Sequence, residues 1–304
     1  MSPDPTLIPS VESGERSVMP SSPLALLPPS AVSSEANVSW LHRFAAFVAV
    51  VEFLALVLGA MGHLTSGAYP SFSPWIIEIS AALFVILAVW LAWGGAARYL
   101  KILGWGTAGL AVMQALVWGT ASRLDPSTAQ VLTHTPLTLL IFGLAVLLAL
   151  FTRTDWRWDL PKVPDVAAPS FRQLSVFTTL TLFADMVVGS IHARGLMRLA
   201  PHFIGGILVS AGALWMLEIA LNKFSALRAL KIAAIILAEL VIIELLLGLV
   251  SYRTEVDSHA LAHPLPGLAV MRATHAALGA LTLAASLTAT LQSFKYLARR
   301  ATNL

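Results

Sequence analysis

Long runs of apolar residues alternate with short polar intervals along most of this chain. Eight of these runs approach or exceed the roughly 20 residues that an α-helix needs to cross a hydrocarbon core of about 30 Å. They lie near residues 44–62, 75–96, 102–121, 131–151, 174–192, 201–221, 231–250 and 268–292. The pattern predicts an all-α integral membrane protein with eight transmembrane helices.

The composition agrees with a membrane protein. Hydrophobic residues make up 57% of the 304 residues and charged residues only 12%, and the mean hydropathy is +0.79. These values are far from those of soluble domains. The first 38 residues differ, because they are rich in Pro and Ser and have too few apolar residues to bury a core. We predict a disordered tail over residues 1–38 that is neither a signal peptide nor a transit peptide.

Lys and Arg are concentrated on one side of the predicted spans. If both chain ends lie on that side, fourteen basic residues fall in or beside its segments and five fall on the other side. Because cytoplasmic loops retain positive charge, we expect both termini in the cytoplasm of a bacterium, with the helices in its plasma membrane. The net charge of +3 then reflects topology, so we expect membrane lipid and no nucleic acid as a partner.

The longest polar interval between spans divides the predicted helices into two sets of four. This interval, residues 152–172, contains three Asp and three Pro residues. The two sets also resemble one another, because the fourth and eighth spans each carry a histidine early on, His134 and His275. We predict two pseudo-symmetric four-helix bundles, an N-terminal half over residues 39–151 and a C-terminal half over residues 173–304, joined by a cytoplasmic linker.

Four histidines lie at or near the ends of apolar segments that the orientation places on the outer side: His63, His134, His202 and His275. An imidazole at membrane depth needs a partner, and two imidazoles from facing helices can bind one haem iron. The chain has no cysteine, which excludes disulfides, thiolate ligands, Fe–S clusters and covalent haem attachment. The histidines therefore point to non-covalently bound haem.

The most complete set of candidate residues lies in the C-terminal half. His202 is followed by Gly205 and Gly206, and His275 by Gly279, and we expect these small residues to leave room for a flat macrocycle. The cations nearest to that depth are candidates for binding haem propionates: Arg194, Arg198 and Arg272. We predict that His202 and His275 are the two ligands of one haem iron. The alternative is that each histidine bonds a neighbouring helix and the arginines bind lipid phosphates.

In the N-terminal half the corresponding set is incomplete. His134 takes the position of His275, but Ala81 takes the position of His202. His63 precedes the turn Thr65-Ser66-Gly67, where a solvated loop histidine is the alternative to a ligand. We therefore predict His134 as the one metal-ligating histidine of a second, less complete site.

These features resemble those of haem A synthase, a family of cytochrome oxidase assembly proteins. The resemblance covers roughly residues 44–295. The residues that carry it are Gln114-Ala115-Leu116 followed by His134, the turn Gly59…Leu64-Thr65-Ser66-Gly67, the segment Ile76-Ile77-Glu78-Ile79-Ser80, and His202 with His275.

The resemblance implies eight spans in two halves, with a haem b held by His202 and His275 and haem O handled by the first half. The implied reaction oxidises a methyl group of haem O to a formyl group, which gives haem A. Glu78 and His134 match functional residues of the family's first half. The implied partners are haem O as substrate, haem O synthase, terminal oxidase subunits and an unidentified electron donor.

The chain departs from the family pattern at three places. The family has a His-Arg pair three residues after the glutamate of its second span, where this chain has Ala81 and Ala82. Residues 63–74 lack the cysteine pair of many bacterial members, and His63 replaces the arginine of an Arg-Leu-Thr turn. The resemblance therefore supports the fold and the second haem more strongly than the catalytic first half.

The chemistry divides between the two halves in this interpretation. A haem on His134 would keep one face open for oxygen or water, Glu78 would move protons or stabilise a cation, and the second haem would carry electrons. For Glu78, the alternative is an interfacial carboxylate. Two other functions remain open: a non-catalytic haem-binding assembly or electron-transfer protein, and a proton-coupled carrier. The carrier would use acids within the apolar runs: Glu52, Asp185, Glu218, Glu239 and Glu244.

Overall fold

The computed structural model describes residues 29–62, 72–121, 128–156, 158–259 and 266–299, and these residues form long helices and two short strands. The helices are α1 (Pro29–Gly62), α2 (Phe72–Trp93), α3 (Arg98–Ala121), α4 (Thr128–Phe151), α5 (Phe171–Ala193), α6 (Ala200–Asn222), α7 (Arg228–His259) and α8 (Pro266–Tyr296), and the strands are β1 (Val163–Pro164) and β2 (Leu297–Ala298). All eight described helices are long and apolar enough to cross a membrane. The prediction of an all-α chain with eight apolar helices is confirmed.

Two helices extend well beyond their predicted ends. α1 begins at Pro29, inside the segment that the sequence predicts as a tail, while residues 1–28 lie outside the described residues. Proline suits the first turn of a helix, and neither glycine nor a further proline interrupts the sequence before Gly59. α7 continues to His259, nine residues past its predicted end at residue 250. Hydropathy detects only the apolar part of a helix, so it misses polar turns that continue outside the membrane.

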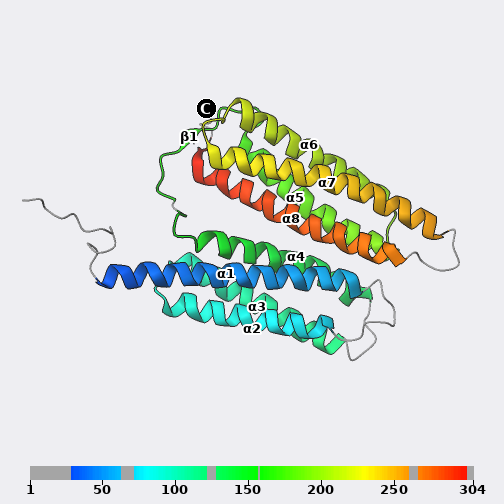
Figure 1. Ribbon diagram of the computed structural model, residues 1–304, viewed down its shortest axis with the longest axis horizontal. Coiled ribbons are helices and arrows are strands. Elements are labelled where there is room, and N and C mark those ends of the chain that lie inside the picture. Colours follow the sequence, from blue (N-terminus) through cyan, green and yellow to red (C-terminus); the bar gives the residue numbers. More distant parts are fainter. Residues whose placement is uncertain (1–28, 63–71, 122–127, 157, 260–265, 300–304) are drawn as a thin grey trace, which may run out of the picture.

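The helices form two groups that meet along one side (Figure 1). In the first group, α1 and α3 each contact α2 and α4, and in the second, α6 and α8 each contact α5 and α7. The groups meet where α8 contacts α1 and α4 and where α4 contacts α5. The start of α1, the interval between α4 and α5, and the end of α8 lie at one end of the helices (Figure 1). We call the opposite end the distal end.

Each group has an apolar core of its own. The core of α1–α4 is built on the buried side chains Phe84, Leu87, Leu91, Ile141 and Leu148. The core of α5–α8 is built on Phe171, Met216, Ile219, Leu237 and Leu283. Hydroxyl pairs also join α5 to α8, with Thr179 Oγ1 2.7 Å from Ser286 Oγ and Ser175 Oγ 3.2 Å from Ser293 Oγ. Such bonds between small side chains hold helices together where lipid is as apolar as the core.

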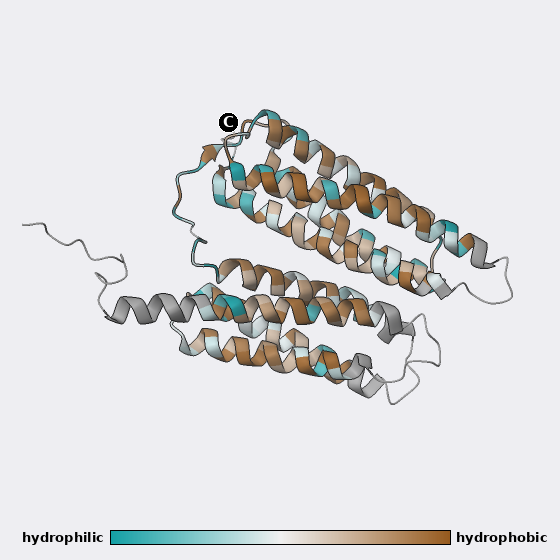
Figure 2. Ribbon diagram, in the orientation of Figure 1, coloured by the Kyte–Doolittle hydropathy of each residue, from teal (hydrophilic) through white to brown (hydrophobic). Residues whose placement is uncertain are grey.

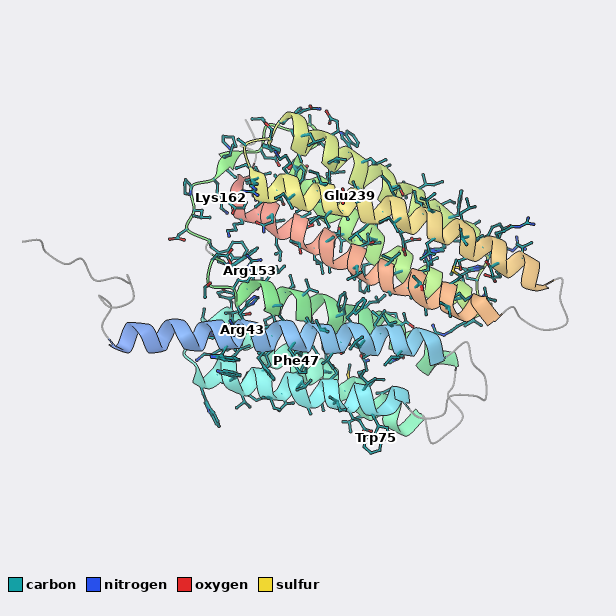
Figure 3. All side chains as sticks on the ribbon, in the orientation of Figure 1. Arg43, Phe47, Trp75, Arg153, Lys162 and Glu239 are labelled. Atoms are coloured by element: carbon teal, nitrogen blue, oxygen red, sulfur yellow. The ribbon has the colours of Figure 1, made fainter. Side chains whose placement is uncertain are left out.

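The outer surface of the helices is suited to lipid. Figure 2 shows hydrophobic residues along the middle of the helices and hydrophilic residues mainly towards their ends. Exposed tryptophans lie at the ends of the first two apolar segments, with Trp40 and Trp93 at one end and Trp75 at the distal end (Figure 3). Tryptophan prefers the level of the lipid headgroups. These side chains therefore mark two interfaces separated by the length of the apolar segments.

The second part of the interval between α4 and α5 is attached to the second helix group. β1 pairs in parallel with β2, with Val163 beside Leu297. The carboxylate of Asp165, which is buried, accepts hydrogen bonds from Ser170 Oγ at 2.6 Å and from the backbone N–H groups of Phe171 and Arg172 at 3.2 Å. The first N–H groups of a helix have no partner within the helix, so this carboxylate completes the start of α5.

Replacing Asp165 with alanine is expected to lower the free energy of unfolding of the second group by about 1–3 kcal/mol, because buried donors at the start of α5 lose their acceptor. The melting temperature of the purified protein in detergent measures the effect. Asp159→Ala, which truncates an exposed acid earlier in the same interval, is the matched control. Equal melting temperatures for the two variants would contradict the capping role of Asp165.

Candidate functional site

Two histidines meet inside the second helix group, near its distal end. His202 is the third residue of α6 and His275 the tenth residue of α8. Their ring centroids are 6.1 Å apart and the ring planes are inclined by 65°. The edge of one ring is thus turned towards the other, and the two rings link α6 to α8, each of which contacts α5 and α7.

One carboxylate lies against each ring, and the two carboxylates come from the two other helices of the group. Nδ1 of His202 is 2.9 Å from Oδ1 of Asp185 on α5, in a hydrogen bond. Nδ1 of His275 is 3.0 Å from Oε1 of Glu244 on α7, at ion-pair distance but not aligned as a hydrogen bond. Each helix of the group thus supplies one side chain of a two-histidine, two-carboxylate set. A carboxylate at Nδ1 fixes the orientation and tautomer of the ring and leaves Nε2 as the atom that can bind a metal.

Glycines allow the first histidine and its carboxylate to sit close to the helix backbones. A Cβ atom at Gly189 of α5 would lie only 2.8 Å from the ring of His202. A Cβ atom at Gly205 of α6 would overlap the carboxylate of Asp185, whereas one at Gly206 would have no atom within 4 Å. The sequence predicts that Gly205 leaves room for a macrocycle, and this is wrong because the Asp185 carboxylate takes that space.

The second histidine and its carboxylate are accommodated in the same way. A Cβ atom at Gly248 of α7 would lie 3.3 Å from the ring of His275. A Cβ atom at Gly279 of α8 would lie 3.1 Å from Oε1 of Glu244. Gly279 therefore makes room for a carboxylate and not, as the sequence predicts, for a macrocycle. All four members of the set are packed against the backbone of a neighbouring helix at a glycine.

The spacing of the two rings fits a shared metal. Two imidazoles that bind one metal at about 2.0 Å per bond place their ring centres about 6 Å apart, and 6.1 Å is observed. Two imidazoles are the axial pair that a haem iron takes, because the porphyrin supplies the remaining ligands. Within the described ranges, no three His, Asp or Glu side chains are grouped so that they could hold a bare metal ion. The spacing of the two rings therefore suits a haem iron better than a bare ion, while the space at Gly205 and Gly279 is taken by carboxylates.

The three arginines predicted to bind propionates are at the distal end, but two of them have protein partners. Arg194 donates a hydrogen bond to Thr135 Oγ1 of α4 at 3.1 Å, across the contact between the helix groups. Burial lowers the pKa of the Arg194 guanidinium from its ordinary value. Arg272 forms an ion pair with Glu255 at 3.0 Å, and Arg198 is exposed. Arg194 thus connects the second group to the residue next to His134.

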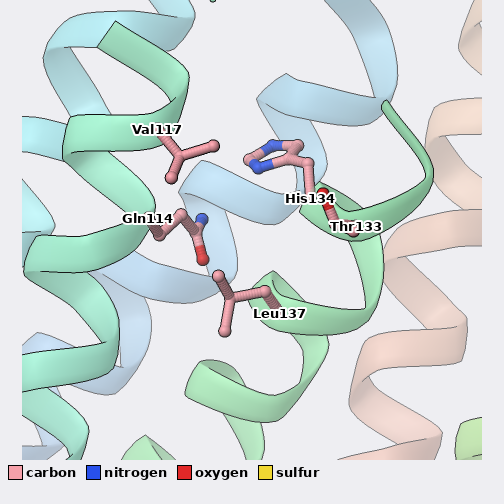
Figure 4. Close-up of a pocket in the computed structure, with 5 residues that line it drawn as sticks. All are labelled: Gln114, Val117, Thr133, His134 and Leu137. Atoms are coloured by element: carbon pink, nitrogen blue, oxygen red, sulfur yellow. The ribbon is translucent and has the colours of Figure 1, made fainter. Parts of the chain in front are cut away.

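The predicted residues of the first half are less closely grouped. His134 of α4 faces a cavity of about 20 Å³ that it lines with Gln114, Val117, Thr133 and Leu137 (Figure 4). The exposed carboxylate of Glu78 makes neither a hydrogen bond nor an ion pair with His134 in the part of the chain that the structure describes. Ala81 is buried in the apolar core, and His63 lies outside the described residues. A cavity of this size has room for about one water molecule.

Neither Asp185 nor Glu244 is among the site residues that the sequence predicts. Both stand out as acids within apolar runs, but they lie 17 and 31 positions from their histidines, on other helices.

Comparisons with known proteins found no matching family model, no matching curated protein and no matching solved structure. The interpretation of this site therefore depends on its geometry and on the residues themselves.

Proposed function

We propose that this protein is a membrane haemoprotein of the haem A synthase type, which oxidises a methyl group of haem O to a formyl group. The observation that supports this best is the pair of rings of His202 and His275, which lie 6.1 Å apart in the second helix group. In this proposal the second half holds haem b, which supplies a one-electron redox couple when it is bound.

The side chains around the paired rings have defined tasks in this proposal. His202 and His275 would hold the iron through Nε2, which would leave no place for an external ligand. Asp185 holds the His202 ring by a hydrogen bond at Nδ1, which raises the basicity of a histidine ligand and fixes its direction, and Glu244 lies at ion-pair distance from Nδ1 of His275. Arg198, which is exposed at the distal end, is available to a propionate, while Arg194 and Arg272 would have to exchange their present partners.

The first half is proposed to take haem O, for which the helices around the small cavity beside His134 would have to move apart. His134 is the candidate ligand, and Glu78 at the distal end of α2 is the candidate carboxylate for moving protons. Arg194 at the end of α5 donates to Thr135, the neighbour of His134, and this bond between the helix groups at the distal end supports the proposal of two sites near one another. This arrangement supports a division in which the second half passes electrons to the first.

The proposed setting follows the distribution of Lys and Arg. We place both termini and the interval between α4 and α5 in the cytoplasm and the distal end on the outer side of a bacterial plasma membrane. In this setting the two helix groups are pseudo-symmetric copies of one four-helix bundle. The proposed partners are haem O synthase, subunits of a terminal oxidase and an electron donor.

A second candidate function is that of a haem-binding assembly or electron-transfer protein without catalysis. The observation that favours it is Ala81, which is only 5% exposed and lies in the apolar core of α1–α4. An alanine there offers no ligand to iron, so the first half has one candidate protein ligand in the described chain. The second half would then hold haem as before.

Spectra of the purified protein and an assay with haem O distinguish these functions. We expect a Soret band and a sharp α-band after reduction, as for an iron with two imidazole ligands. Membranes that contain the protein are expected to convert added haem O to haem A, and membranes without it are the control. Bound haem without conversion would support the second candidate, and a protein without any Soret band would exclude both.

A further inference from the structure

One layer in the interior of α1–α4 is polar. It contains one side chain from each helix: Glu52, Ser80, Gln114 and Thr138. Each of these side chains is at most 5% exposed. They lie seven to ten residues from the distal ends of their helices, which at 1.5 Å per residue corresponds to a common depth of about 10 to 15 Å. We call these four residues the polar layer.

The hydrogen bonds within the polar layer leave two acceptors unpaired. Ser80 Oγ donates to Oε2 of Glu52 at 2.5 Å, and Gln114 Nε2 donates to Thr138 Oγ1 at 3.0 Å. Thr138 Oγ1 in turn donates to the carbonyl oxygen of His134 at 2.9 Å. Oε1 of Glu52 and Oε1 of Gln114 are both buried without a hydrogen bond. Buried polar atoms are nearly always paired, so the layer lacks at least one donor.

No positive charge compensates Glu52 within the described ranges. α1 packs against α2, α4 and α8. The acidic, basic and histidine side chains within those three helices are Glu78, His134, Arg272, His275 and Lys295. Glu78 is exposed, Arg272 pairs with Glu255, His275 lies against Glu244, and Lys295 donates to the carbonyl oxygen of Asp155. None of them forms an ion pair with Glu52.

We propose that Glu52 is a proton-binding site in the interior of the first helix group. An unpaired carboxylate is unfavourable in a buried place, whereas the neutral acid adds an O–H donor to a layer that lacks one. The acid takes up a proton and exchanges it with the distal side. This site is separate from the paired histidines and does not depend on haem.

The route to the distal side starts at Gln114. Gln114 belongs both to the polar layer and to the cavity of about 20 Å³ beside His134 (Figure 4). A cavity of that size has room for about one water molecule, and its lining combines the polar residues Gln114, Thr133 and His134 with Val117 and Leu137. In this proposal the Glu52 carboxyl exchanges its proton with water at the distal end, so that a carboxylate remains on release and water is protonated.

Infrared spectroscopy of the full chain in lipid nanodiscs tests the proposal. At pH 7 the wild type is expected to show the carbonyl stretching band of a protonated carboxylic acid, and Glu52→Gln is expected to lack it. Glu218→Gln, which removes an exposed carboxyl group of α6, is the matched control and is expected to keep the band. Transfer of the wild type to heavy water is expected to shift the band, because the proton exchanges.

A second variant keeps the test informative if Glu52→Gln does not fold. Ser80→Ala removes the donor to Oε2 and is expected to shift the same band without abolishing it. Identical acid carbonyl absorption in wild type and Glu52→Gln would overturn the proposal, as would a Ser80→Ala spectrum without any shift. A band that does not respond to heavy water would overturn the exchange route. Because these measurements require no haem, they are independent of the proposed enzymatic function.

Discussion

Replacement of His202 is expected to remove nearly all haem from the purified protein. The substitution takes away a direct ligand, so haem retention should fall by more than the roughly 10- to 100-fold that loss of a residue supporting a metal ligand causes. His202→Gln is the better variant, because its amide can still donate a hydrogen bond to Asp185, whereas His202→Ala leaves that buried carboxylate unpaired. The ratio of Soret absorbance to protein absorbance measures the loss.

A histidine outside the site provides the control for this experiment. His192 is also at the distal end of the second helix group, where its Nδ1 pairs with the carbonyl oxygen of Met197. His192→Gln should keep the haem and the reduced α-band, and His275→Gln should lose them. If the His202 and His275 variants keep an unchanged spectrum, the two rings are not the ligands.

The adjacent glycines of α6 provide a second test with a large expected difference. Gly205→Ala inserts a methyl group where the Asp185 carboxylate lies, while Gly206→Ala meets no atom within 4 Å. Loss of the contact between Asp185 and His202 should weaken haem retention by about 10- to 100-fold. Both substitutions gain the same roughly 1 kcal/mol of helix propensity. A difference in haem retention between the two variants therefore reports the displacement of the Asp185 carboxylate.

Haem titration of the two glycine variants, together with their melting temperatures, measures this effect. Gly206→Ala should bind haem as the wild type does and melt at the same or a slightly higher temperature. Gly205→Ala should bind more weakly. Equal haem affinities would show that Asp185 does not orient His202 in the bound state.

The helices could be predicted from the sequence because apolar length alone identifies a membrane-spanning helix. The fourth helix was expected over residues 131–151 and runs from Thr128 to Phe151. The polar ends could not be predicted in this way, as α7 illustrates, because hydropathy carries no signal once a helix leaves the membrane. β1 and β2 have only two residues each and depend on contact between distant segments.

The site could be predicted only in part. The sequence singles out His202 and His275 because imidazoles are rare within apolar segments, and the structure brings their rings together. It does not show which acid faces which ring, because that depends on how each helix is rotated about its axis. For the same reason the sequence does not predict the partner of Arg194, which is Thr135 on the other helix group.

The pairing of β1 with β2 and the Asp165 contacts have a consequence for how the chain can be divided. Val163, Pro164 and Asp165 are anchored to the end of α8 and to the start of α5, and Lys295 of α8 also contacts Asp155 at the start of the connection. If the coding sequence were divided between codons 158 and 162 and the two parts were expressed separately, each polypeptide would keep a complete set of four helices. Co-expressed, they would reassemble where α1 and α4 contact α8 and where α4 contacts α5, without any peptide bond between them.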